Sequence, residues 1–126
     1  MQLTEAHGTG TKLGDPIEAG SLAKAVLAER QSSMPLMCGS VKSSIGHGES
    51  TAGMTGLLKL TVGLRYGETA PNAQLRLLNP HLGSTLRCVS CALPVQLSRL
   101  SADARHGGVS SFGYSGTIAH LSLIHI

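Results

Sequence analysis

Aromatic side chains are almost missing from this sequence, which contains one phenylalanine, two tyrosines and no tryptophan. Proteins that bind nucleic acid usually combine clustered cations with aromatic rings that stack on bases. Here the ten lysines and arginines are scattered along the chain, and the formal net charge is only +3. The composition therefore argues against nucleic acid as a partner.

Long apolar runs are also missing. None approaches the roughly 20 residues that a membrane-spanning helix needs. The beginning of the sequence, MQLTEAHG, lacks the basic and then apolar stretch of a secretory signal. We therefore expect no membrane partner and a cytoplasmic location, with the plastid as the alternative compartment for a parent protein.

Cysteine is scarce, and its number is odd: Cys38, Cys88 and Cys91. An odd number argues against the disulfide framework of a small secreted protein. Cys88 and Cys91 form a C-x-x-C pair, but a structural zinc ion would require four ligands. The preferred interpretation is that the cysteines are small buried apolar side chains on strands, so we expect no metal site.

Two helices are predicted within what is at most one domain of 126 residues. The first should run from Asp15 to about residue 30, because Asp15, Pro16 and Glu18 resemble a capping box with proline at the first position. The second should begin near residue 50 and end at Gly67. Gly53 and Gly56 within it weaken it by ~1 kcal/mol each relative to alanine, which is tolerable where another backbone packs closely.

Strands are predicted for residues 36–41, 86–93, 109–112 and 118–126, where apolar residues lie between turn signals. The proline- and asparagine-rich residues 70–83 indicate an extended loop, and residues 97–108 indicate turns. The segment before His7 is too short to suggest a supporting element. The order of elements predicts an α/β protein with layers around a buried sheet.

His7 lies in the glycine- and threonine-rich stretch EAHGTGTKLGDP. Such a backbone can approach a ligand closely, and the hydroxyls of Thr9 and Thr11 could bind the amide-rich arm of a carrier thioester. The same residues are equally compatible with a tight turn that is capped by threonines.

His47 lies in VKSSIGHGES, between two glycines and close to Lys42 and Glu49. A carboxylate paired with the lysine would fix both side chains, and a nearby ammonium would keep the histidine neutral. A neutral imidazole can donate an N–H group to a developing oxyanion. The alternative is a histidine at a helix start beside a solvated ion pair.

A third stretch, GGVSSFGYSGTIAH, places a glycine-rich turn between two strands. A turn of this kind can present a backbone N–H to an oxyanion. It could equally be an ordinary hairpin bend.

Together these stretches resemble the β-ketoacyl synthase (ketosynthase) family, most closely the ketosynthase domains of modular polyketide synthases. The resemblance rests on EAHGTGTKLGDPIEAGSL, GSVKSSIGHGESTAGMTGLLK and GVSSFGYSGTIAH, in this order, and on LNPHL. It extends from Glu5 to about His120. It assigns residues 1–120 to the C-terminal portion of the domain and leaves 121–126 as an atypical tail, which suggests a truncated or misjoined reading frame.

The resemblance implies the C-terminal half of a thiolase-like layered α/β fold, a mixed sheet with packed helices and an incomplete copy of the whole. It implies decarboxylative Claisen condensation of malonyl-type carrier thioesters in polyketide or fatty acid biosynthesis. It assigns catalytic roles to His7, His47, Lys42 and Glu49. It assigns substrate binding to Thr9, Thr11, Phe112, Gly113 and Tyr114, with the Tyr114 N–H completing an oxyanion hole.

The family also implies partners. They are an acyl carrier protein that bears the substrate on phosphopantetheine, the N-terminal half of the ketosynthase, and a second subunit in a homodimer. No cofactor is expected on this chain itself.

This sequence departs from the family pattern at several positions. The family's nucleophilic cysteine belongs to the N-terminal half, and none of the three cysteines here lies in a matching motif. Ser44, Gly48, Ser50, Thr51, Ser115 and Ile118 replace the usual residues. Ser115 stands in place of a glycine and is expected to stiffen the turn, because serine loses glycine's positive-φ range.

Three functions remain open at this stage. The chain is part of a condensing enzyme, or a non-catalytic module that binds carrier or coenzyme A thioesters, or a thiolase that condenses without decarboxylation. The two-histidine signature disfavours the thiolase. The fold normally buries this half against other parts, so we expect the isolated chain to expose an apolar face, to fold poorly or aggregate, and to be inactive alone.

Overall fold

The computed structural model describes residues 1–30, 33–87, 89–101 and 105–126. Five strands form one mixed sheet in the order β4-β2-β1-β6-β7. Strand β7 runs antiparallel to β6, and the other neighbouring pairs are parallel. The strands are β1 Leu3–Glu5, β2 Leu36–Gly39, β4 Cys91–Ala92, β6 Arg105–Phe112 and β7 Ile118–His125. The expected mixed sheet is confirmed.

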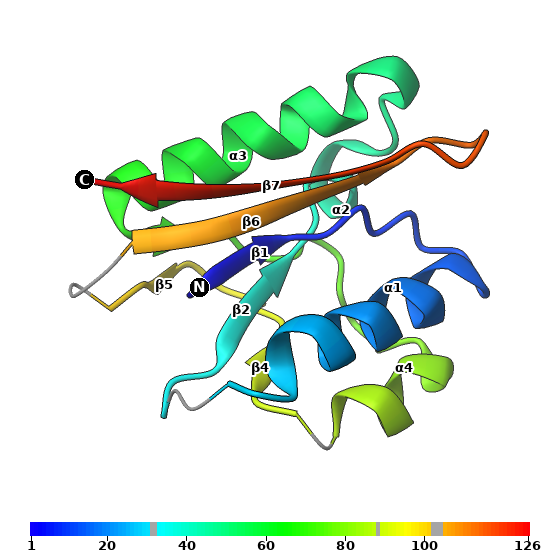
Figure 1. The fold of residues 1–126 in the computed structure, drawn as a ribbon, viewed down its shortest axis with the longest axis horizontal. Helices are drawn as coiled ribbons and strands as arrows, with labels where there is room; N and C mark the ends of the chain where they lie inside the picture. The colour runs from blue at the N-terminus through cyan, green and yellow to red at the C-terminus, as the bar shows by residue number, and fades with distance from the viewer. Residues whose placement is uncertain (31–32, 88, 102–104) are drawn as a thin grey trace.

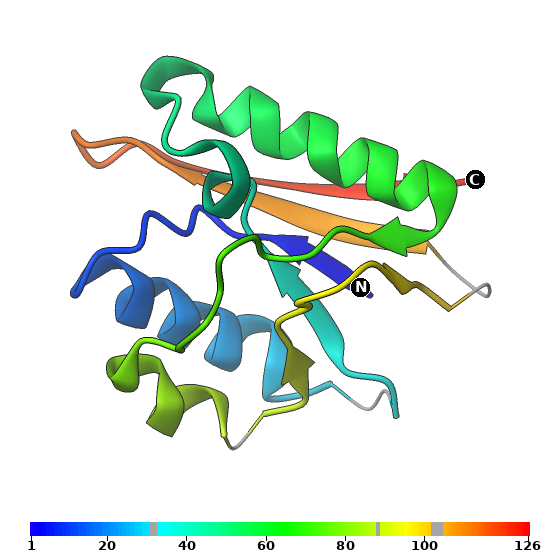
Figure 2. The ribbon, with the colours of Figure 1, turned by 180° about the vertical axis from the view of Figure 1, so that it is seen from behind.

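Helices cover both faces of this sheet. Helix α3, Ala52–Tyr66, lies along β6 and β7, whereas α1, Gly14–Leu22, and α4, Pro80–Leu86, lie together at the opposite side (Figures 1 and 2). Helix α1 continues as a π-helical segment, Ala23–Leu27. A short antiparallel pair, β3 Glu68–Thr69 and β5 Ser98–Arg99, accompanies the main sheet.

Two apolar clusters follow from this layering. One packs α3 against the sheet and consists of Leu3, Leu60, Leu64 and Val109. The other packs the α1 side and consists of Leu27, Leu36 and Cys38. Because side chains alternate along a strand, consecutive residues of β2 contribute to the two opposite cores.

The second predicted helix is confirmed. A 3₁₀ turn, Glu49–Thr51, leads into α3, and Gly67 ends the helix with φ of 69°. Gly53 and Gly56 both have close neighbours, as expected for glycines that are tolerated inside a helix. A Cβ atom on Gly56 would lie 3.2 Å from Cγ of Glu5, and one on Gly53 would lie 2.8 Å from Oγ of Ser111.

The expectation that nothing supports His7 from the N-terminal side was wrong. Residues Leu3–Glu5 form β1, which lies at the centre of the sheet between β2 and β6. Three residues suffice because both neighbours supply hydrogen bonds and Leu3 is buried against α3. The parallel pairing is between distant segments, so local sequence carries little sign of it.

The predicted capping box was also wrong. The N-cap of α1 is Leu13, without a side-chain bond. The two acidic residues bind the preceding loop instead: Asp15 accepts from the Gly10 N–H at 3.0 Å, and Glu18 accepts from the N–H groups of His7 and Gly8. The loop folds back over the helix. The two carboxylates therefore accept hydrogen bonds from N–H groups of the loop, rather than from N–H groups of the helix.

Three further predictions needed correction. Residues 70–83 are not all loop, because Pro80–Leu86 forms α4, capped by Asn79, whose side chain accepts from the His81 N–H at 3.0 Å. The strand predicted over 86–93 is reduced to Cys91–Ala92. The Asn-Pro pair was a helix-start signal rather than a loop signal. A short helix, α2 Lys42–Ile45, likewise occupies the expected turn after β2.

The C-terminal hairpin is longer than expected. Strand β6 begins at Arg105 within the region predicted as turns, and β7 pairs with it through His125. The boundary expected after residue 120 therefore falls inside a paired strand. In the turn it is Gly116, with φ of 91°, that has the positive angle, so Ser115 does not stand at a position that needs glycine's positive-φ range.

Cys38 is buried on β2, and Cys91 is half-buried on β4. Cys88 lies outside the described residues, so the C-x-x-C pair is not tested. Among the residues with described positions, no group of His, Cys, Asp or Glu is arranged to hold a metal ion. No helix in the described ranges has both the length and the apolar character needed to cross a membrane.

Candidate active site

A hollow of about 860 Å³ lies where the start of α3, the β6–β7 hairpin and the end of β1 meet. His7 and His47 both line it, with Phe112, Gly113 and Tyr114 of the hairpin. Its apolar wall includes Met54, Leu57, Val109 and Leu121. The three sequence stretches singled out above thus meet at one site.

The two imidazole rings lie close together, with centroids 5.6 Å apart and planes at 86°. His7 follows directly from the β1 segment, and His47 precedes the 3₁₀ turn that leads into α3. The two rings therefore come from segments that are far apart in the sequence, and only the folded structure brings them together.

Backbone donors define which nitrogen of each ring carries the proton. Nδ1 of His47 accepts a hydrogen bond from the N–H of Glu49 at 2.8 Å. Nδ1 of His7 accepts a longer bond from the N–H of Phe112 at 3.4 Å. A backbone N–H can only donate, so Nδ1 must be unprotonated in the neutral rings, and Nε2–H remains as the donor of each.

The surroundings of His7 favour this neutral form. Burial lowers the pKa of His7, the ammonium of Lys42 and then His47 lower it further, and Asp15 opposes them in part. The Phe112 ring lies 5.3 Å from the His7 ring and excludes water from that side. At neutral pH, His7 is therefore a hydrogen-bond donor without a positive charge.

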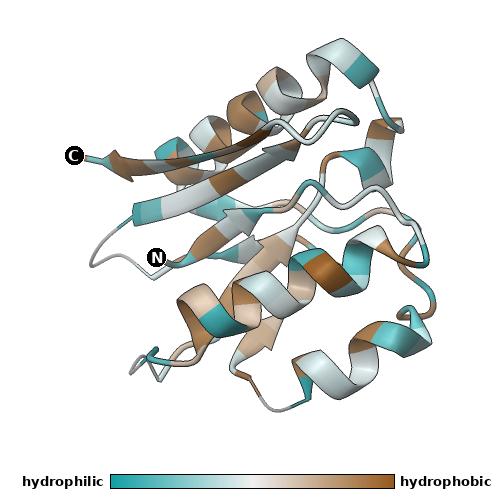
Figure 3. Cartoon of the chain, turned by 45° about the vertical axis from the view of Figure 1, so that its right-hand side comes forward, coloured by the Kyte–Doolittle hydropathy of each residue, from teal (hydrophilic) through white to brown (hydrophobic). Residues whose placement is uncertain are grey.

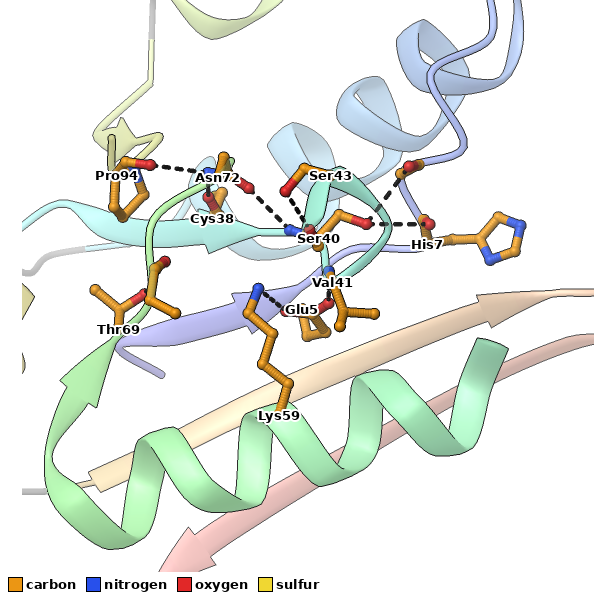
Figure 4. Close-up of polar contacts among 12 residues, drawn as sticks. Glu5, His7, Cys38, Ser40, Val41, Ser43, Lys59, Thr69, Asn72 and Pro94 are labelled. Atoms are coloured by element: carbon orange, nitrogen blue, oxygen red, sulfur yellow. Dashed lines mark hydrogen bonds and ion pairs between the residues drawn. The ribbon is translucent and has the colours of Figure 1, made fainter. Parts of the chain in front are cut away.

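The expected ion pair between Lys42 and Glu49 is not formed. The ion pair found among the described residues joins Lys59 and Glu5, with Nζ and Oε2 2.7 Å apart (Figure 4). Burial lowers the pKa of Lys42, and the negative charges of Glu5 and Glu18 oppose this lowering in part. Glu49 is exposed and contributes through its backbone N–H.

Sequence reasoning missed Glu5 and Lys59 as parts of this region. Glu5 is 2% exposed, and its second oxygen accepts from the N–H of Val41 (Figure 4). The available signal was a lysine on the otherwise buried stripe of α3, which includes Gly56 and Leu60. A lysine on such a stripe indicates a buried carboxylate opposite it.

The backbone of the hairpin turn leaves one N–H group available to donate a hydrogen bond. The Gly113 N–H is occupied by the carbonyl of Thr117 at 2.7 Å, and the Gly116 N–H by the carbonyl of Gly113 at 3.0 Å. Tyr114 is fully exposed at the mouth of the hollow. Within the described part of the chain, its N–H has no acceptor, so it is free to bind a ligand oxygen.

Thr9 and Thr11 lie in the loop after His7 rather than in the wall of the hollow. Their hydroxyl oxygens are 3.4 Å apart, and Thr11 accepts from the Gly14 N–H at 3.0 Å. The described cysteines, Cys38 and Cys91, belong to the core on the α1 side and do not line the hollow. A cysteine nucleophile at this site is therefore not supplied by the described residues.

Comparison with known proteins identifies the family of the chain. The family described as "Beta-ketoacyl synthase, C-terminal domain" matches residues 1–76. The chain belongs to this family. The match covers β1, α1, β2 and α3, and with them both histidines.

Related sequences extend the match to nearly the whole chain. The chain is 44% identical over 121 residues to erythronolide synthase EryA2 of Saccharopolyspora erythraea, covering 96% of this chain and 3% of that protein. It is 44% identical over 117 residues to highly reducing polyketide synthase PKS6 of Gibberella zeae, covering 93% of this chain and 4% of that protein. The chain thus spans a small part of these curated relatives.

Solved ketosynthases share the fold. The oxazolomycin ketosynthase domain OzmH KS7 of Streptomyces albus JA3453 superposes with a TM-score of 0.88 at 37% identity, covering 98% of this chain and 23% of that chain. The ketosynthase from module 1 of the bacillaene synthase of Bacillus amyloliquefaciens FZB42 superposes with a TM-score of 0.89 at 34% identity, covering all of this chain and 22% of that chain. The fold is therefore the thiolase-like fold of ketosynthases.

Proposed function

We propose that the chain supplies the histidine part of a β-ketoacyl synthase active site that performs decarboxylative Claisen condensation on carrier-bound thioesters in polyketide biosynthesis. In this reaction a malonyl thioester loses carbon dioxide, and the electron pair of the broken bond forms an enolate. The enolate carbon then attacks an acyl thioester held on a cysteine, and the thiolate leaves.

The observation that carries the proposal is the pair of imidazoles. With both Nδ1 atoms occupied by backbone N–H groups, His7 and His47 present two Nε2–H donors at one hollow. Two N–H donors that are directed at one hollow can stabilise the carbonyl oxygen as it becomes an enolate. Burial lowers the pKa of His7, and Lys42 assists because its charge lowers this pKa further.

The other residues receive roles that fit this chemistry. The free Tyr114 N–H donates to the oxygen of the tetrahedral adduct that forms at the acyl thioester. Phe112 and Gly113 form the adjoining wall, and Thr9 and Thr11 bind the phosphopantetheine arm of an acyl carrier protein. Glu49 acts through its N–H on His47, rather than through its carboxylate.

The nucleophilic cysteine comes from the N-terminal half of the ketosynthase in this proposal. Four side chains on one face of α3 are more than half exposed and support the existence of such a covering part: Met54, Leu58, Val62 and Tyr66. They are spaced four residues apart and therefore lie on one side of the helix. Figure 3 shows that apolar segments recur along the ribbon of α3. We further propose that the parent enzyme is a cytoplasmic homodimer.

The test uses a complete ketosynthase, in which residues 1–126 are joined to the N-terminal half of a polyketide ketosynthase. We expect it to release carbon dioxide from a malonyl thioester, and His7→Ala or His47→Ala to slow that release by about 10²–10³-fold. His81→Ala removes a histidine from α4, outside the site, and is the matched control. Equal rates in all variants would contradict the proposal.

A non-catalytic thioester-binding module is the second candidate, because no described cysteine lines the hollow. In that case the complete ketosynthase would bind a carrier thioester without releasing carbon dioxide. The same assay, combined with a binding measurement, therefore separates the two functions.

A further inference from the structure

Two cysteines on neighbouring strands lie side by side on the α1 side of the sheet. In the parallel pairing of β2 and β4, Cys91 is the partner of Leu36, so Cys38, two residues further along β2, points to the same face. Both side chains belong to the apolar cluster on the α1 side. Their thiols are close enough to form a hydrogen bond with each other. The fold therefore builds a dithiol away from the candidate active site.

The hydrogen bond makes the two thiols unequal in acidity. The Cys38 thiol donates to Cys91 and lowers the pKa of Cys91 to about 7, whereas burial acts in the opposite direction. The pKa of Cys38 is raised, first by this hydrogen bond and then by burial. The Leu36 carbonyl, 3.6 Å from Sγ of Cys38, is an alternative acceptor, but an ionised Cys91 is stronger because it is charged. At neutral pH, Cys91 is thus partly a thiolate, and Cys38 keeps its proton.

Of these two thiols, Cys91 is the accessible one. Cys38 is 6% exposed, whereas Cys91 is half-buried and lines a hollow of about 450 Å³ beside α4. The other walls of this hollow are largely apolar and include Leu78, Pro80, Leu86 and Leu93. A small uncharged molecule can therefore reach the sulfur atom of Cys91, with the second sulfur atom directly behind it.

We propose that Cys38 and Cys91 are a redox-modification site, at which a small uncharged hydroperoxide converts the dithiol to a disulfide. The inference goes beyond the proposed condensation and does not depend on it. A disulfide in a cytoplasmic protein is transient and serves redox sensing more often than structure.

The two steps balance. The Cys91 thiolate attacks one oxygen of the hydroperoxide, so that an S–O bond forms, the O–O bond breaks, and the departing oxygen takes up a proton as an alcohol or water. Cys38 then attacks the sulfur of this sulfenic acid, so that the S–S bond forms, the S–O bond breaks, and hydroxide leaves as water with the proton of Cys38. The two thiols lose two electrons, and the hydroperoxide gains them.

Strands β2 and β4 can close this bond with a small movement. Diagonal neighbours in a sheet have Cα atoms about 7–8 Å apart, whereas a disulfide usually spans less than about 7 Å. Strand β4 has two residues and lies at the edge of the described sheet, so it can shift. The side-chain amide of Asn72 keeps the strands together, because it donates to the carbonyls of Cys38 at 3.0 Å and Pro94 at 3.3 Å (Figure 4). The disulfide is therefore strained and easily reduced, as a transient modification requires.

Peptide mapping of the complete ketosynthase tests the proposal. The protein is treated with hydrogen peroxide at pH 7, the remaining thiols are blocked with N-ethylmaleimide, and the sample is digested with trypsin without reduction. Trypsin cleaves after lysine and arginine, so Cys38 falls in peptide 31–42, and Cys88 and Cys91 fall together in peptide 88–99. We expect these two peptides to be joined, with a mass two hydrogen atoms below their sum, and to separate after treatment with dithiothreitol.

Three variants identify the sulfur atoms that react. Cys88→Ser is the matched control and should retain the link between the two peptides, whereas Cys91→Ser should lose it. Cys38→Ser retains a hydrogen-bond donor beside Cys91 but removes the second sulfur atom. In that variant Cys91 should stop at the sulfenic acid, which dimedone traps and mass spectrometry detects.

Several outcomes would overturn the proposal. A disulfide confined to peptide 88–99, or a link that disappears in Cys88→Ser, would assign the oxidation to Cys88. Complete blocking of Cys38 and Cys91 by maleimide after peroxide treatment would show that the pair does not react. The map of the unmutated protein decides these points even where a variant fails to fold, and it requires no condensation activity, so a failure of the proposed function leaves the test intact.

Discussion

The ammonium of Lys59 lies 2.7 Å from the carboxylate of Glu5, which is almost fully buried at the end of β1, two residues before His7. This pair connects α3 to the central strand β1. It replaces the ion pair that the sequence suggested between Lys42 and Glu49. The ion pair near the site therefore joins α3 to β1, rather than two residues that flank His47.

Replacing Lys59 with methionine is expected to destabilise the protein by about 3–5 kcal/mol, because it leaves a buried carboxylate without its partner. Urea denaturation of the complete ketosynthase measures the change. Lys24→Met, at an exposed lysine, should stay within about 0.5 kcal/mol. The double variant Glu5→Gln/Lys59→Met should recover part of the loss, and a double variant less stable than Lys59→Met would contradict this account.

Glu49 has a positive φ of 46°, which residues with a side chain rarely adopt. This conformation places its N–H against Nδ1 of His47. We expect Glu49→Asn to retain most decarboxylation, because asparagine tolerates this backbone and the carboxylate is not required. Glu49→Val should reduce both stability, by about 1–2 kcal/mol, and activity.

The Glu49 variants are compared by urea denaturation and by carbon dioxide release. Ser50→Val, at the next position and without a positive φ, is the control for introducing a β-branched residue into the same turn. Strong loss of activity in Glu49→Asn would show that the side chain itself takes part.

The lowered pKa of His7 predicts how stability depends on pH. In the unfolded chain the imidazole gains a proton below about pH 6.5, whereas in the folded protein it gains one only at a lower pH. Between these two values the unfolded state binds more protons, so the free energy of unfolding falls as the pH falls. Above about pH 6.5 this contribution is constant.

The measurement is a series of urea denaturations of the complete ketosynthase between pH 5 and pH 8. The raised pKa of Glu18 makes a contribution of the opposite sign, and this contribution is present in both wild type and His7→Gln. The difference in the free energy of unfolding between the two proteins therefore isolates the contribution of His7. We expect wild type to lose stability relative to His7→Gln below about pH 6.5. A flat difference would contradict the lowered pKa.

The exposed stripe on α3 predicts that the 126-residue chain alone associates or aggregates. Met54 and Leu58 are 61% and 62% exposed, and apolar surfaces of this kind favour association. Leu58→Lys combined with Val62→Glu should reduce association of the isolated chain in light scattering, and should also prevent it from combining with an N-terminal ketosynthase half. The matched control, Ile17→Lys, changes an exposed apolar residue on α1 and should affect neither property.

Local patterns in the sequence were sufficient for some features. Helix α3 and its end at Gly67 followed from apolar spacing and a terminal glycine, and β7 from a run of apolar residues. The residues of the candidate site were predicted from three motifs, and the structure brings His7, His47 and the hairpin to one hollow. These features depend on the secondary-structure preferences of neighbouring residues, or on motifs that occur in a fixed order along the sequence.

Other features depended on which distant segments meet. Strand β1 consists of three residues whose hydrogen-bond partners are more than thirty and one hundred residues away. Glu18 had the sequence context of a helix cap, yet its carboxylate binds the loop that folds back over α1. In each case several partners were locally possible, and packing selected one of them.

The sequence by itself determined the residue types that can do the chemistry and the order in which they occur. The tertiary structure alone decided which carboxylate meets which donor: Glu5 binds Lys59, Glu18 binds the His7 backbone, and Glu49 serves through its N–H. The physical reason is that hydrogen bonds and ion pairs act over a few ångströms. Only the folded sheet brings residues that are tens of positions apart within that range.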